Sequence, residues 1–135
     1  MNFNGLLFSG ANNAWKFNKF QENVEDGILT AKEIYSLNLS NTDLLILSAC
    51  QTGLGENNDI DGNEGLLRAF KVAGVNEVII TLWNISDDAT SSIMKAFYKN
   101  LLEIKDPREA LKTTINKAKK DMPDPYYWAP FIVIE

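Results

Sequence analysis

The 135-residue sequence predicts an α/β fold in which parallel strands are buried between helix layers. Three apolar runs support this prediction, namely LLILSA at residues 44–49, VIITLW at 78–83 and FIVI at 131–134. The first run is apolar on both faces and ends in small residues, as in a buried parallel strand. The segments between the runs are long and have helical periodicity, so we expect crossover helices that join parallel strands.

The segment between the first two runs predicts a helix from near Asn63 to Gly74. Asparagine is a good helix cap, and glycine tolerates the left-handed conformation in which helices end. Its buried face is expected to consist of Leu66, Leu67, Phe70 and Ala73. Earlier in the chain, GLLFSG is a candidate strand, and Thr30 and Glu33 have the spacing of a capping box that opens a short helix.

Two more helices are expected between VIITLW and FIVI. Ser86 can cap the first of them with its hydroxyl. Asp106 can cap the second, with Pro107 at the first helical position and Glu109 placed to complete a capping box. The expected inner faces are Ala89, Ile93, Phe97 and Leu101 in the first helix and Leu111, Ile115 and Ala118 in the second.

Composition predicts one domain over residues 1–135 and excludes several partners. The net charge of −5 and the pI near 4.7 argue against nucleic acid, which selects basic surfaces. No window approaches the roughly 18 apolar residues of a membrane span, so no membrane contact is expected. A single cysteine and the absence of a recognisable signal peptide predict a cytoplasmic location.

Cys50 is the strongest candidate for chemistry. Ligands bind beyond the carboxyl ends of parallel strands, and Cys50 directly follows the run at 44–49. In the glycine-punctuated loop after it, Gln51 and Gly53 are the candidate substrate-binding positions. The alternatives are that Cys50 is a small buried hydrophobe, or a redox-sensing thiol, which needs exposure and a lowered pKa.

Asp87 and Asp88 follow the second run and are expected at the same rim as Cys50. A carboxylate there can receive a basic side chain of a substrate. The alternative is that both residues complement the helix dipole, which favours negative charge in a first turn.

The sequence predicts no cofactor and no metal. The glycine-rich loop lacks the lysine of a P-loop, and one cysteine with no histidine cannot build a zinc site. Calcium is also disfavoured. Asn57, Asp59, Asp61 and Gly62 have EF-hand spacing, but the closing position is Arg68 in place of a chelating glutamate.

Three stretches, DLLILSACQTGLGE, NEGLLRAFKVAGVNEVIITLWNISDDAT and YYWAPFIVIE, resemble the CHAT domain, a caspase-like cysteine peptidase family related to separase. The resemblance implies a three-layer α/β/α fold with a mostly parallel sheet. It implies that Cys50 is the nucleophile of a histidine–cysteine dyad acting on a peptide or protein substrate. It also implies that Asp87, or failing that Asp88, lines the pocket for a basic residue before the scissile bond, and that helical-repeat domains are partners.

The sequence departs from this family in one respect, because it contains no histidine. In the family the histidine lies at the end of an earlier strand. We therefore expect a C-terminal portion of the domain, inactive by itself, whose partner is the missing N-terminal segment. An exposed sheet edge then favours a homo-oligomer. The alternative function is a non-catalytic interaction module, a degenerate CHAT domain.

Overall fold

The computed structural model describes residues 5–9, 11, 27–47 and 60–135, except for the side chains of residues 60–64. In this part of the chain the elements are, in order, β1 Gly5–Leu7, β2 Ile28–Thr30, α2 Ala31–Ile34, β3 Leu44–Leu47, α3 Ile60–Ala73, β4 Glu77–Thr81, α4 Asp87–Ile104, α5 Pro107–Asp121, the 3₁₀ turn η1 Pro125–Tyr127 and β5 Phe131–Ile134. The predicted α/β class is confirmed.

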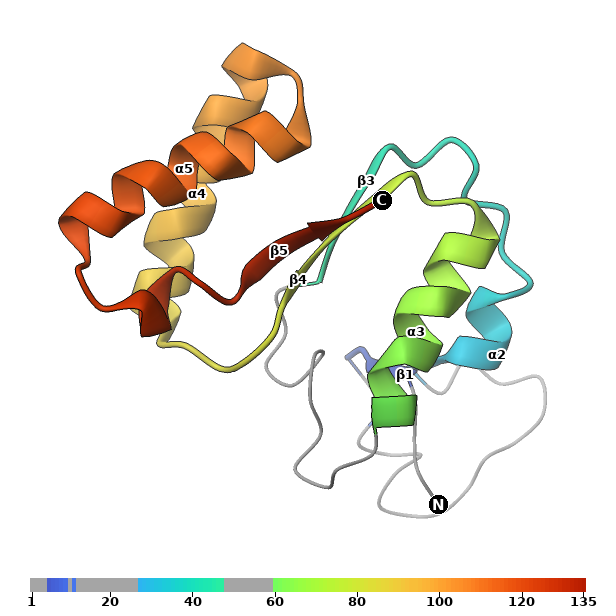
Figure 1. The fold of residues 1–135 in the computed structure, drawn as a ribbon. Coiled ribbons are helices and arrows are strands. Elements are labelled where there is room, and N and C mark those ends of the chain that lie inside the picture. The colour runs from blue at the N-terminus through green and yellow to red at the C-terminus, as the bar shows by residue number, and fades with distance from the viewer. Residues whose placement is uncertain (1–4, 10, 12–26, 48–59) are drawn as a thin grey trace.

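The three-stranded sheet β3–β4–β5 lies between two helix layers (Figure 1). Side chains of β4 alternate between the layers, because Val78 and Ile80 pack with α2 and α3, whereas Ile79 packs with α4 and α5. This alternation follows from the two-residue period of a strand. It explains why the strand runs are apolar throughout, since both faces of the sheet are covered.

The direction of β5 differs from the prediction. β3 and β4 are parallel, with Leu47 opposite Ile80, but β5 is antiparallel to β4, with Phe131 opposite Thr81. The reason is the number of intervening helices. One crossover helix returns the chain to the start of the previous strand, whereas α4 followed by α5 brings it back to the end of β4, where β5 begins.

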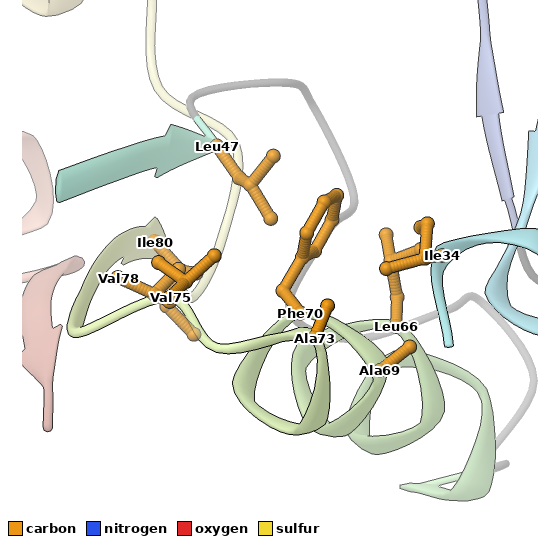
Figure 2. Packing of buried hydrophobic residues seen from close by; sticks show 9 residues of the cluster. All are labelled: Ile34, Leu47, Leu66, Ala69, Phe70, Ala73, Val75, Val78 and Ile80. Carbon is orange, nitrogen blue, oxygen red and sulfur yellow. The ribbon is translucent and has the colours of Figure 1, made fainter. Parts of the chain in front are cut away.

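The core on the α3 side is built as the sequence predicts. Leu66, Phe70 and Ala73 of α3 are buried, and Figure 2 shows Phe70 pointing between Leu47 and Ile34. The helix begins three residues before the predicted Asn63, at Ile60, and its end is as predicted. The nine labelled residues are Ile34, Leu47, Leu66, Ala69, Phe70, Ala73, Val75, Val78 and Ile80.

On the opposite face, α4 and α5 pack against each other and the sheet through Ile93, Phe97 and Leu111. The Ser86 hydroxyl accepts the Ala89 amide, and the Asp106 carboxylate accepts the Glu109 amide, so both predicted caps are confirmed. The capping box predicted at Asp106 is not completed, because the Glu109 carboxylate accepts hydrogen bonds from the Lys112 ammonium and not from the Asp106 backbone N–H.

The N-terminal described residues form a small antiparallel hairpin. Gly5–Leu7 matches part of the predicted strand, and its partner strand, Ile28–Thr30, was not predicted. Thr30 and Glu33 do form a capping box at the start of α2. Among the helices of the described part of the chain, none combines the length and apolarity that a bilayer crossing requires.

Candidate functional site

The predicted rim is formed by the carboxyl ends of β3 and β4. These strands are parallel and adjacent, so the residues that follow Leu47 and Thr81 leave the sheet at the same edge. The chain after β4 passes through Trp83 and Asn84 to Ser86, which caps α4. Ligand sites of α/β proteins occur at such edges.

Three of the five predicted site residues, Cys50, Gln51 and Gly53, lie outside the residues that the structure describes. Their proximity to Asp87 and Asp88 therefore stays a prediction. In the sequence Cys50 comes three residues after Leu47, the last residue of β3.

Asp87 and Asp88 both lie in the first turn of α4 and are exposed. Both carboxylates therefore lie where the positive end of the α4 dipole favours negative charge. This position agrees with the alternative that they complement the helix dipole. Only Asp88 also lines a cavity of about 390 Å³, and Asp87 is not among the lining residues. The two neighbouring carboxylates therefore have different surroundings.

This cavity lies between the start of α4 and the segment that precedes η1. Its walls are mostly apolar, and two carboxylates, Asp88 and Asp124, belong to them. The described lining residues are Ser86, Asp88, Ala89, Ser92, Met122, Pro123, Asp124 and Tyr127. A smaller cavity of about 140 Å³ between α4 and α5 shares Ser92 and Met122 with it.

Aromatic residues tie the chain after β4 to η1. The indole Nε1 of Trp83 donates a 3.0 Å hydrogen bond to the carbonyl of Tyr126, and the Tyr126 hydroxyl donates a 2.6 Å hydrogen bond to the carbonyl of Asn84. The two ring centroids are 6.4 Å apart. These contacts fix the segment that leads into Ser86, Asp87 and the rest of the first turn of α4.

No part of the site was assigned to residues 122–127 from the sequence. The number of helices between β4 and β5 is a signal in the sequence that could have revealed their contribution. Two helices between β4 and β5 bring the chain back to the carboxyl end of β4, so the turn before β5 must lie beside Trp83. Asp124, which caps η1 by accepting the Tyr126 amide, is the residue that this argument would have found.

Within the described residues no group of histidine, cysteine, aspartate and glutamate side chains is arranged to hold a metal ion. The edge of the sheet beyond β4 combines carboxylates at the start of α4, the apolar walls of the cavity and the exposed aromatic rings of Trp83 and Tyr126. It can recognise a side chain that combines an aliphatic stem with a positive charge.

The family model described as the CHAT domain matches residues 2–135, nearly the whole chain. The chain belongs to the CHAT domain family. The match includes Cys50 and the strands β3 and β4.

Two curated relatives have the same name in different organisms. Tetratricopeptide repeat protein 28 of Mus musculus is 34% identical over 111 residues, which is 79% of this chain and 4% of the relative. Tetratricopeptide repeat protein 28 of Homo sapiens is 30% identical over 116 residues, which is 82% of this chain and 4% of the relative. The CHAT domain chain thus spans only about 4% of the length of these relatives.

Proposed function

We propose that this CHAT domain chain is the nucleophile-bearing part of a caspase-like cysteine endopeptidase. The supporting observation is the parallel register of β3 on β4, with Leu47 opposite Ile80. In the sequence Cys50 follows Leu47, the last residue of β3, by three residues, and α/β proteins bind ligands beyond the carboxyl ends of such parallel strands. Cys50 is the proposed nucleophile, and Gln51 and Gly53 are the proposed substrate-binding residues beside it.

The proposed substrate has a basic residue immediately before the scissile bond. Asp87 is the proposed specificity residue, because it follows Trp83 by four residues and its carboxylate is exposed. A carboxylate binds arginine through charge-assisted hydrogen bonds that an uncharged side chain cannot replace. Asp88 is the second candidate for this role.

The proposed general base is a histidine from outside these 135 residues, since the sequence contains none. An isolated thiol has a pKa near 8.5, so only a few per cent is thiolate at pH 7. An adjacent imidazole activates the thiol in cysteine peptidases. We therefore expect the chain alone to be inactive.

The test is reconstitution. The chain is combined with a histidine-bearing N-terminal CHAT segment, either fused to Met1 or added as a separate polypeptide. Cleavage of a peptide after arginine should appear, and Cys50→Ser should abolish it. Asp87→Asn should lower kcat/KM for the arginine substrate by about 10²-fold, since a lost charge-assisted pair costs about 1.5–3 kcal/mol. A folded reconstituted protein that cleaves nothing would overturn the proposal.

A second candidate function is a non-catalytic interaction module, favoured by the absence of histidine from the sequence. The curated relatives are named for tetratricopeptide repeats, which supports helical-repeat domains as partners in either case. In the described sheet β3 and β5 each pair on one side only, which supports association of copies through an edge. We propose the cytoplasm as the compartment, in keeping with the single cysteine.

A further inference from the structure

We infer that the flank of α4 that faces away from α5 is a docking surface for a helix with an apolar face bordered by acidic residues. This helix belongs to the segment that supplies the histidine, so the inference rests on the proposed function and adds where that segment binds. The docking flank consists of an apolar stripe, Met94, Tyr98 and Leu102, and three lysines, Lys95, Lys99 and Lys105.

The opposite side of α4 is occupied by α5. The Asn100 side-chain amide of α4 donates a 2.9 Å hydrogen bond to the Thr114 hydroxyl of α5, and Ser92 and Ala96 of α4 line the small cavity between the two helices. Each residue of the stripe comes two positions after one of these three α4 residues, which is slightly more than half a helical turn. The stripe therefore lies on the side of α4 that α5 leaves uncovered.

The docking flank leaves large apolar side chains in water. Tyr98 is 50% exposed, and Leu102, at 79%, is the most exposed large hydrophobic residue in the described part of the chain. The two are four residues apart and therefore adjacent on the helix surface. Met94 extends the stripe by one turn and is partly buried against the core. A second helix packed here would remove this apolar surface from water.

The sheet beside the docking flank is covered only in part. α5 contacts β5, at one end of the strand order, so the flank of α4 away from α5 lies on the β3 side. In the described sheet β3 pairs with β4 alone, and Leu44 and Ile46 are half-buried on this face. A strand added beside β3 would need a helix to cover it, because α/β sheets are covered on both faces. That helix would pack against the docking flank.

The charges of the docking flank favour acidic residues on the incoming helix. From Ala89 to Leu102 the sequence contains no aspartate or glutamate, although the chain has a net charge of −5. Lys95 and Lys99 are exposed, lie one turn apart beside the stripe, and make no ion pair within the described residues. Carboxylates opposite these lysines would steer the helix to the flank and fix its orientation.

A second copy of the chain is a poorer occupant of the docking flank. Two α4 helices related by a two-fold axis near Tyr98 would place the same lysine, Lys99, from both copies close together. Like charges that face each other across an interface are unfavourable. An acidic helix from a different segment meets no such repulsion.

The test combines the full chain with the histidine-bearing N-terminal CHAT segment, added as a separate polypeptide. Isothermal titration calorimetry measures the affinity, and hydroxyl-radical footprinting read by mass spectrometry locates the contact. We expect Tyr98 and Leu102 to lose most of their reactivity toward the radical when the segment is added. Val72, which is 62% exposed on α3 in the other helix layer, should react as before.

Three variants assign the contact. Leu102→Glu should weaken binding at least about tenfold, because the apolar surface it removes is buried in the complex. Lys99→Glu should weaken binding about fivefold at low salt and less at high salt, as for a rim charge. Val72→Glu is the matched control, with the same kind of change at an exposed helix position, and should bind within twofold of the unmodified chain.

Unchanged affinity in Leu102→Glu, or no association of the segment with the folded chain, would overturn the inference. Tighter binding by Lys99→Glu would overturn the acidic character of the helix. Sedimentation velocity of the chain alone covers the remaining occupant, since a dimer that Leu102→Glu dissociates would assign the flank to a second copy. Peptide cleavage judges the proposed function separately, because a segment that binds through the flank without cleavage would contradict the peptidase alone.

Discussion

The hydroxyl of Tyr126 donates a hydrogen bond of 2.6 Å to the backbone carbonyl of Asn84, 42 residues earlier in the chain. A second hydrogen bond runs from Trp83 Nε1 to the Tyr126 carbonyl. The two bonds join the segment that follows β4 to η1, which precedes β5. The site at this edge is therefore built by residues 122–127 as well as by the loop after β4.

Tyr126→Phe removes the hydroxyl and keeps the ring. We expect a loss of about 1 kcal/mol in the free energy of unfolding, because the Asn84 carbonyl is partly solvated and recovers water. Urea denaturation followed by tryptophan fluorescence measures it. Tyr127→Phe is the control, since its hydroxyl makes no hydrogen bond within the described residues, and an equal loss in both variants would contradict the role of the Tyr126 hydroxyl.

Gly74→Ala should destabilise the fold by about 2 kcal/mol or more. Gly74 has φ of 109°, a backbone conformation that is strained for alanine. A Cβ there would also lie 2.9 Å from the backbone of Ser40, so the steric clash adds to the backbone strain. Thermal unfolding followed by circular dichroism measures the effect. Gly74→Asn tests the clash, because asparagine tolerates positive φ better but still has a Cβ; stability equal to wild type in that variant would rule the clash out.

Thr114→Val should cost about 1–3 kcal/mol, since it leaves the Asn100 amide without its acceptor between α4 and α5. Thr114 is 1% exposed, its hydroxyl accepts from Asn100 Nδ2 at 2.9 Å, and it donates to the Ala110 carbonyl. Chemical denaturation measures the loss. The neighbouring Thr113 is exposed, so Thr113→Val should change stability by less than about 0.5 kcal/mol, and equal effects would contradict a specific interhelical link.

Glu33 should titrate below its ordinary value of 4.5. The Thr30 backbone N–H, at 2.7 Å, and the Thr30 hydroxyl, at 2.8 Å, both donate to its carboxylate, and these bonds lower its pKa. Because the folded pKa lies below the unfolded one, the stabilisation is present above pH 4.5 and is lost as the pH falls through the lowered value.

Side-chain carbon NMR measures this Glu33 pKa directly. Thr30→Val removes the hydroxyl donor and should bring the pKa partly back toward 4.5. The effect on stability should be only a few tenths of a kcal/mol, because the carboxylate is exposed to solvent. A wild-type pKa at or above 4.5 would show that the capping box does not form in solution.

The sequence predicted those elements whose local signals agree with their packing. Ser86 and Asp106 cap helices as their positions indicate, and the apolar faces of α3, α4 and α5 are buried as their periodicity indicates. The strand at Ile28–Thr30 was missed because three residues carry no measurable period.

The predicted direction of β5 was wrong for a different reason. FIVI is apolar on both faces whether it runs parallel or antiparallel, so its residues do not encode its direction. That direction depends on how many helices precede it. The cavity of Asp88 and Asp124 was missed for the same reason, since its two walls are joined only by the path of the chain through α4 and α5.

Covalent labelling of Cys50 tests the central claim most directly. The reconstituted protein, with a histidine-bearing N-terminal CHAT segment, is incubated with a peptidyl-arginyl acyloxymethyl ketone, and intact mass and peptide mapping locate the adduct. The account predicts one adduct, on Cys50, formed at least about tenfold faster than in the chain alone, since an adjacent imidazole raises the thiolate fraction from a few per cent at pH 7. Labelling at the same slow rate with and without the histidine segment, in a folded complex, would contradict the account.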